Sequence, residues 1–119
     1  MNLILVARVV GKHEFLSENK PMHREQVIAT LRAHEPELKQ AGVVRLSLFG
    51  STVRGDRRPD SDIDLLAAFD ETRRISLLDV IHIENQIADL LGEPVDLLVE
   101  GTLKPHVKEN VAREAVRAF

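Results

Sequence analysis

Apolar residues recur along the chain at two different periods, and this alternation predicts a mixture of helices and strands. After Arg24, the residues Val27, Ile28 and Leu31 follow one another at helical spacing. Pro36 should end this helix near His34 and begin a short second turn, "PELKQ", because proline suits the first position of a helix. The segment before the first strand is therefore predicted to be helical in two pieces.

Three later segments have the length and composition of strands. The segment "VVRLSLF" places Val44, Leu46 and Leu48 on one face by a period of two. The segments "DIDLLAAF" and "PVDLLVE" follow as the second and third strands. Between the first two, "TVRG" can form a short helical turn, and "DRRPDS" is a polar loop broken by Pro59.

Two further helices complete the pattern. The segment "SLLDVIHIENQIADLLG" carries Val80, Ile83, Ile87 and Leu90 on one stripe and ends at Gly92. A last helix is predicted from residues that would share one face: Val107, Val111, Ala115 and Phe119. The fold class that follows is α/β (α+β), a small mixed three-stranded sheet flanked by helices.

The length of the chain, 119 residues, suits one domain with a single core. Residues 1–21 precede the first clean amphipathic pattern, so we interpret them as an N-terminal extension and residues 22–119 as the domain. The apolar opening "MNLILVARVV" is too short to cross a bilayer and lacks the features of a secretory signal. We expect no membrane partner.

The residue balance excludes several classes of protein. The net charge of −3, with no Trp or Tyr and four Phe, argues against direct nucleic-acid binding. The absence of cysteine excludes disulfides, thiolate metal sites and a cysteine nucleophile. It is also compatible with a reducing cytoplasm, which is the location we expect.

Three aspartates lie at the heads of two predicted strands. Residues i and i+2 of a strand project to the same side, so Asp62 and Asp64 should point together, about 6.5 Å apart along the backbone. Asp96 stands between Val95 and Leu97 in the third strand and repeats the arrangement. A lone Asp-x-Asp is more often a solvated loop edge, but pairing of these strands would bring three carboxylates together. Such oxygen ligands suit Mg²⁺, and two ions about 4 Å apart can clamp a nucleotidyl transfer.

The residues after the first strand supply a complementary phosphate site. Gly50 and Ser51 stand at the mouth of the helical turn, where backbone N–H groups and a hydroxyl can meet a polyphosphate. A Cβ on Gly50 would obstruct the approach of the phosphates. Arg54 lies in the turn and is the first choice for neutralising the charge that develops on the phosphates. Arg57 and Arg58 could be phosphate ligands, but they fit a solvated loop equally well.

The motif "GS", ten residues and then "DID" resembles the active-site signature of the nucleotidyltransferase superfamily that includes DNA polymerase β. The segments "LFGSTVRGD", "SDIDLLAAF" and "VDLLVEGTLKPHVKENVAREAV" are similar to those of minimal nucleotidyltransferase (MNT) antitoxins, which are encoded beside HEPN-domain toxins. The resemblance covers Met22 to Phe119 and implies a polymerase β-like nucleotidyltransferase fold.

The same resemblance implies an activity, which is the transfer of AMP from ATP to a tyrosine of the HEPN toxin. Asp96 would help to deprotonate the attacking hydroxyl as well as complete the metal site. The residues that the resemblance assigns are Gly50 and Ser51 for the triphosphate, and Asp62, Asp64 and Asp96 for Mg²⁺, expected as two ions.

Two other functions compete with this one. The chain could be a catalytically idle antitoxin that silences its partner by binding alone. It could also be a nucleotidyltransferase for a small molecule, although such enzymes usually use a second domain to hold the acceptor. The presence of all three aspartates favours the active protein-modifying enzyme. The base preference, the acceptor residue and the oligomeric state do not follow from the sequence.

Overall fold

The computed structural model of the protein describes residues 22–56, 58 and 60–119. The predicted N-terminal extension, Arg57 and Pro59 lie outside the described residues. In chain order the elements are α2 (Arg24–Ala33), α3 (Glu35–Gln40), β1 (Val43–Phe49), α4 (Ser51–Arg54), β2 (Ile63–Phe69), α5 (Leu77–Leu91), β3 (Val95–Val99), the 3₁₀ turn η1 (Glu100–Thr102), α6 (Pro105–Glu114) and β4 (Val116–Arg117).

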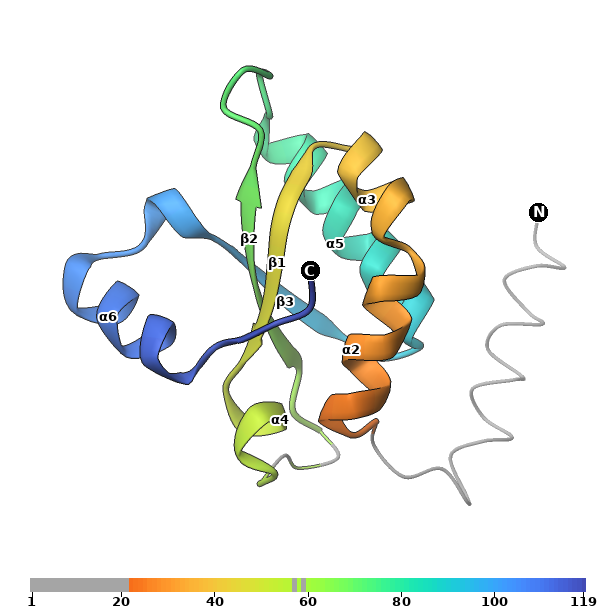
Figure 1. The fold of residues 1–119 in the computed structure, drawn as a ribbon, viewed down its shortest axis with the longest axis vertical. Coiled ribbons are helices and arrows are strands. Elements are labelled where there is room, and N and C mark those ends of the chain that lie inside the picture. Colours follow the sequence, from red (N-terminus) through yellow and green to blue (C-terminus); the bar gives the residue numbers. More distant parts are fainter. Residues whose placement is uncertain (1–21, 57, 59) are drawn as a thin grey trace, which may run out of the picture.

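The strands form one mixed sheet in the order β3-β2-β1-β4. Strands β1 and β2 are antiparallel, whereas β2 and β3 are parallel and are joined by the crossover helix α5. Figure 1 shows α2, α3 and α5 together on one side of the sheet and α6 on the other. The predicted fold class is confirmed, with one strand more than expected.

The core lies between the sheet and the three-helix layer. Strand residues that alternate along β1 and β2 are fully buried, and they meet buried leucines and isoleucines of the helices. The largest fully buried side chains are Leu31, Leu38, Leu46, Leu48, Ile63, Leu65 and Ile87. On the other face of the sheet, where α6 lies, β2 carries the half-buried residues Asp64, Leu66 and Ala68.

Helix α5 has the bounds that the sequence predicts, and both of its ends are capped. The Ser76 hydroxyl accepts from the N–H of Asp79, whose carboxylate accepts in turn from the N–H of Ser76. Gly92 ends the helix in the left-handed conformation. Of the predicted apolar stripe Ile83 and Ile87 are buried, and Leu91 rather than Leu90 completes the buried set.

The prediction that the last helix continues to Phe119 is wrong. Helix α6 ends at Glu114, Ala115 is extended, and the chain then pairs with β1 as the short strand β4. The N–H of Ala118 donates to Leu46 O at 2.8 Å, and the N–H of Leu46 donates to Phe119 O at 3.2 Å. The free edge of β1 needs partners for its backbone groups, and these long-range bonds outweigh the helical period.

The placement of Val44 with the core residues of β1 is also wrong, because this side chain is 45% exposed. The pairing of β1 with β2 shifts register between Val43 and Arg45. Such a bulge inserts one unpaired residue, so the alternation of faces is broken there. Val43 therefore takes the buried position.

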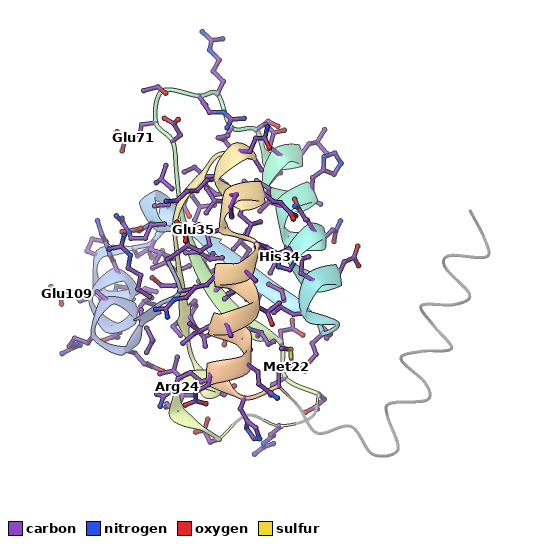
Figure 2. All side chains as sticks on the ribbon, turned by 45° about the vertical axis from the view of Figure 1, so that its right-hand side comes forward. Met22, Arg24, His34, Glu35, Glu71 and Glu109 are labelled. Atoms are coloured by element: carbon purple, nitrogen blue, oxygen red, sulfur yellow. The ribbon has the colours of Figure 1, made fainter. Side chains whose placement is uncertain are left out.

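The helices of the described part of the chain include none that is both long and apolar enough to cross a membrane. At one end of the molecule α2 begins beside α4, where the Arg24 guanidinium donates to Val53 O at 3.4 Å. Figure 2 shows Arg24 at this end of α2, near the end of the sheet that carries the candidate site.

Candidate active site

The pairing of β2 with β3 places two aspartates side by side. In the parallel register Asp64 is the direct partner of Asp96, so their backbones lie about 4.8 Å apart. The residues before and after each aspartate are buried, and both carboxylates therefore project from the face opposite the core. Asp62 precedes β2 by one residue and is exposed, as is Asp96, whereas Asp64 is half-buried.

The grouping has an electrostatic cost that falls on Asp64. Partial burial raises the pKa of Asp64 above its ordinary value, and the negative charges of Asp96 and Asp62 raise it further. The Arg54 guanidinium acts in the opposite direction but does not cancel these effects. Like charges held this close favour a bound cation between them.

The donor set fits Mg²⁺ bound together with a phosphate ligand. The carboxylate oxygens are hard ligands of the kind that Mg²⁺ prefers. Among the described residues, no three acidic or histidine side chains converge closely enough to form a complete metal cage. This is consistent with an ion that takes one or two carboxylates from the protein and its other ligands from phosphates and water.

Gly50 contacts the carboxylate of Asp64 so closely that no side chain fits. A Cβ at this position would lie 3.1 Å from Asp64 Cγ and would overlap Oδ2. The backbone of Gly50 also has a φ of 76° and a ψ of −152°, a conformation that only glycine adopts readily. Glycine is therefore required here because a side chain would displace Asp64. The sequence suggests a second reason, which is that a Cβ would obstruct the approach of the phosphates.

Ser51 is the first residue of α4 and is half-buried. The turn closes tightly, because Gly50 O accepts from the N–H of Arg54 and Ser51 O accepts from the N–H of Gly55. Thr52, which no sequence motif marks, is 5% exposed, and its hydroxyl has no hydrogen-bond partner among the described residues. Gly50 and Ser51 thus form a hydrogen-bonded turn that joins the end of β1 to α4, next to the carboxylate of Asp64.

Arg54 is held by two carboxylates. Its Nε donates to Asp56 Oδ2 at 3.2 Å, and its Nη1 donates to Glu114 Oε1 at 2.5 Å. These two hydrogen bonds and the accompanying charges raise the pKa of Arg54 above its ordinary value. Neither acidic partner is predicted from the sequence. Glu114 follows Arg54 by 60 residues, and no local pattern marks it.

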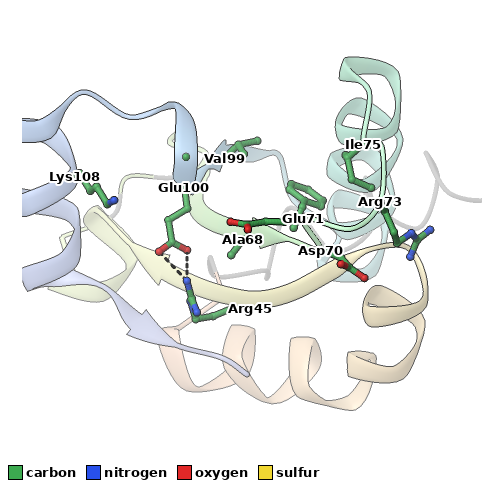
Figure 3. A pocket seen from close by; sticks show the side chains of 11 residues that line it. Arg45, Ala68, Asp70, Glu71, Arg73, Ile75, Val99, Glu100 and Lys108 are labelled. Carbon is green, nitrogen blue, oxygen red and sulfur yellow. Dashed lines mark hydrogen bonds and ion pairs between the residues drawn. The ribbon is translucent and has the colours of Figure 1, made fainter.

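A separate cavity of about 390 Å³ lies at the opposite end of β2 and β3. Figure 3 shows its polar wall, where Arg45 Nη2 contacts both carboxylate oxygens of Glu100 at 2.8 Å. Phe69 lines the cavity from five residues beyond Asp64, about 17 Å away at strand rise. The complete lining is Arg45, Ala68, Phe69, Asp70, Glu71, Arg73, Ile75, Val99, Glu100, Gly101 and Lys108. The cavity is not part of the carboxylate site.

Comparison with known proteins gives the family. The profile of the nucleotidyltransferase domain matches residues 31–118. The protein adenylyltransferase MntA of Thermococcus cleftensis is 41% identical over 93 residues, which are 77% of this chain and 92% of that protein.

Solved structures agree with this match. A candidate minimal nucleotidyltransferase is 40% identical, with a TM-score of 0.70 over 82% of this chain and 98% of the other. The MNT antitoxin bound to a tri-AMPylated HEPN toxin of Shewanella oneidensis shares the fold at 15% identity. Its TM-score is 0.51, over 74% of this chain and 71% of that one. The chain therefore belongs to the nucleotidyltransferase domain family, and it is a minimal nucleotidyltransferase of the group that includes the protein adenylyltransferases.

Proposed function

We propose that this protein is an antitoxin that transfers AMP from ATP to a tyrosine hydroxyl of a HEPN-domain toxin. The observation that carries the proposal is the direct pairing of Asp64 with Asp96, next to a glycine that allows no side chain against Asp64. This arrangement offers carboxylates for Mg²⁺ and a tight backbone turn for phosphates in one place. Because ATP is abundant in the cytoplasm, we propose that the reaction takes place there.

In the proposed reaction, the tyrosine oxygen attacks the α-phosphorus of ATP. The bond from this phosphorus to the oxygen that bridges to the β-phosphate breaks, pyrophosphate leaves, and the hydroxyl proton passes to Asp96. Gly50 and Ser51 hold the triphosphate, and Arg54 neutralises charge on it. Asp62, Asp64 and Asp96 would hold Mg²⁺, proposed as two ions that each take one or two of these carboxylates. When bound, the ions would offset the negative charge of the reacting phosphates.

The relatives support a protein acceptor and a HEPN-domain partner. MntA of Thermococcus cleftensis is named a protein adenylyltransferase, and the toxin in the solved Shewanella oneidensis complex carries AMP groups. The present chain contains no tyrosine, so it cannot be its own tyrosine substrate. The acceptor in the proposal therefore belongs to another protein.

Intact-mass spectrometry tests the proposal directly. The full chain is incubated with a HEPN toxin from the same genome, ATP and Mg²⁺, and the toxin is then weighed. We expect the toxin to gain one or more AMP groups with the wild type and none with the variant Asp62→Asn/Asp64→Asn. A toxin that is silenced without any gain in mass would instead identify an idle antitoxin. A toxin that is neither silenced nor modified would favour a small-molecule acceptor.

A further inference from the structure

The strand pairing of the C-terminal segment brings Glu114 to the candidate site. Strand β4 runs antiparallel to β1, with Leu48 opposite Val116. Helix α6 ends at Glu114, two residues before Val116, and α4 begins at Ser51, three residues after Leu48, so the pairing brings the end of α6 toward the start of α4. Figure 1 shows the end of α6 on the side of the sheet end that carries α4.

The position of Glu114 is fixed, because the C-terminal segment that follows it is held by hydrogen bonds. Ala118 is 1% exposed, and its N–H donates to Leu46 O in β1. The carbonyl of Ala118 accepts from Arg32 Nε of helix α2 at 2.6 Å. The backbone that carries Glu114 is therefore attached both to the sheet and to the helical layer.

Glu114 contacts Arg54, the arginine that the sequence predicts for the nucleotide site. Arg54 Nη1 donates to Glu114, and Arg54 Nε donates to Asp56. A guanidinium has five N–H donors, so three remain for a ligand after these two bonds. The side chain of Arg54 is 51% exposed, and a long side chain of this kind loses considerable rotamer freedom when it is held.

We propose that Glu114 is a positioning residue that holds the Arg54 guanidinium in place for the triphosphate, and this inference rests on the proposed function. Two carboxylates on opposite sides of Arg54 fix its plane before the nucleotide arrives, which lowers the entropic cost of phosphate binding. The C-terminal segment thereby becomes part of the nucleotide site.

A double-mutant cycle tests the inference, with Mg²⁺-ATP affinity measured by calorimetry and transfer measured on the HEPN toxin. We expect Glu114→Ala to weaken Mg²⁺-ATP binding about fivefold and to lower kcat about tenfold. In the Arg54→Ala background the same change should have no effect. Glu114→Gln keeps a side-chain oxygen that can accept from Arg54 and should recover most of the loss. Glu109→Ala removes an exposed charge from the same helix, where Figure 2 shows it on the outer side, and should match the wild type.

The outcomes separate this inference from the proposed function. If Glu114→Ala weakens binding equally with and without Arg54, its role is structural and the inference fails. If Glu114→Ala raises kcat, the contact restrains Arg54 and the inference also fails. If the wild type binds Mg²⁺-ATP but transfers nothing to the toxin, the proposed function fails, and the binding cycle still decides the role of Glu114. A wild type that does not bind Mg²⁺-ATP overturns both.

Discussion

Gly50 and Asp64 are in contact across the end of β1 and the start of β2, and the contact leaves no room for a methyl group on Gly50. We expect Gly50→Ala to displace the Asp64 carboxylate and to abolish Mg²⁺-ATP binding. The positive φ adds a strain of about 1–2 kcal/mol for any other residue. Calorimetry and thermal unfolding of the same variant measure the two effects.

Gly55 is the matched control for Gly50. Its φ of 81° resembles that of Gly50, but nothing lies within 4 Å of a Cβ built there. Gly55 has a ψ of 12°, in the left-handed helical region, whereas Gly50 has a ψ of −152°. Gly55→Ala should therefore show only the strain of a positive φ, without a steric clash. Each kcal/mol of that strain corresponds to about 5 °C in Tm for a chain of this size. It should keep Mg²⁺-ATP binding. Equal loss of binding in both variants would refute the specific contact with Asp64.

The cost of grouping the carboxylates gives a second prediction. Asp64→Asn should raise the Tm of the nucleotide-free protein at pH 7, because it removes a partly buried charge from beside Asp96. The same variant should lose Mg²⁺-ATP binding. Asp60→Asn, a change of the same kind at an exposed loop position, should leave the Tm unaltered. A lower Tm for Asp64→Asn would contradict the electrostatic account.

The pH dependence of stability follows from the raised pKa of Asp64. The folded protein binds this proton more readily than the unfolded chain, whose aspartates titrate near their ordinary value of about 3.9. The free energy of unfolding therefore falls as the pH rises from that value through the pKa of folded Asp64. In urea titrations, the difference in stability between Asp64→Asn and the wild type should grow with pH over this window. A constant difference would exclude the effect.

The sequence was sufficient for the parts of the site that depend on strand alternation. Asp64 and Asp96 each stand between apolar residues, so burial of those neighbours forces both carboxylates to the other face. The short distance along the chain from Gly50 to Asp64 is also visible as a motif. Such local patterns predict the structure because burial of the apolar residues in the core determines which face of the sheet the aspartates occupy.

The parts that the sequence did not predict depend on contacts between distant segments. The pairing of Val116 with Leu48 has no local signal, since two residues cannot display a strand period. Without that strand, the contact from Arg54 to Glu114 could not be foreseen. The bulge that exposes Val44 likewise arises from the register with β2 and not from the composition of β1.

Removal of metal gives a fourth prediction. The carboxylates do not form a complete cage among the described residues, so Mg²⁺ alone should bind weakly and ATP should supply further ligands. Calorimetry should show ATP affinity that falls at least about tenfold when EDTA replaces Mg²⁺. Asp62→Asn/Asp64→Asn should abolish this difference. If the ATP affinity depended neither on Mg²⁺ nor on these aspartates, the assignment of Asp62 and Asp64 to the Mg²⁺-ATP site would be wrong.

Asp96 separates binding from chemistry in the last prediction. Asp96 is exposed and lies beside Asp64, so the loss of one charge there should leave most of the ligands for Mg²⁺-ATP in place. If Asp96 accepts the proton of the attacking hydroxyl, Asp96→Asn should lower kcat by about 10²–10⁴ while the Kd for Mg²⁺-ATP changes only a few-fold. Single-turnover transfer to the HEPN toxin, followed by intact mass, measures the first quantity, and calorimetry measures the second. Parallel losses of binding and transfer would make Asp96 a ligand for Mg²⁺ only, and an unchanged kcat would place the proton acceptor elsewhere.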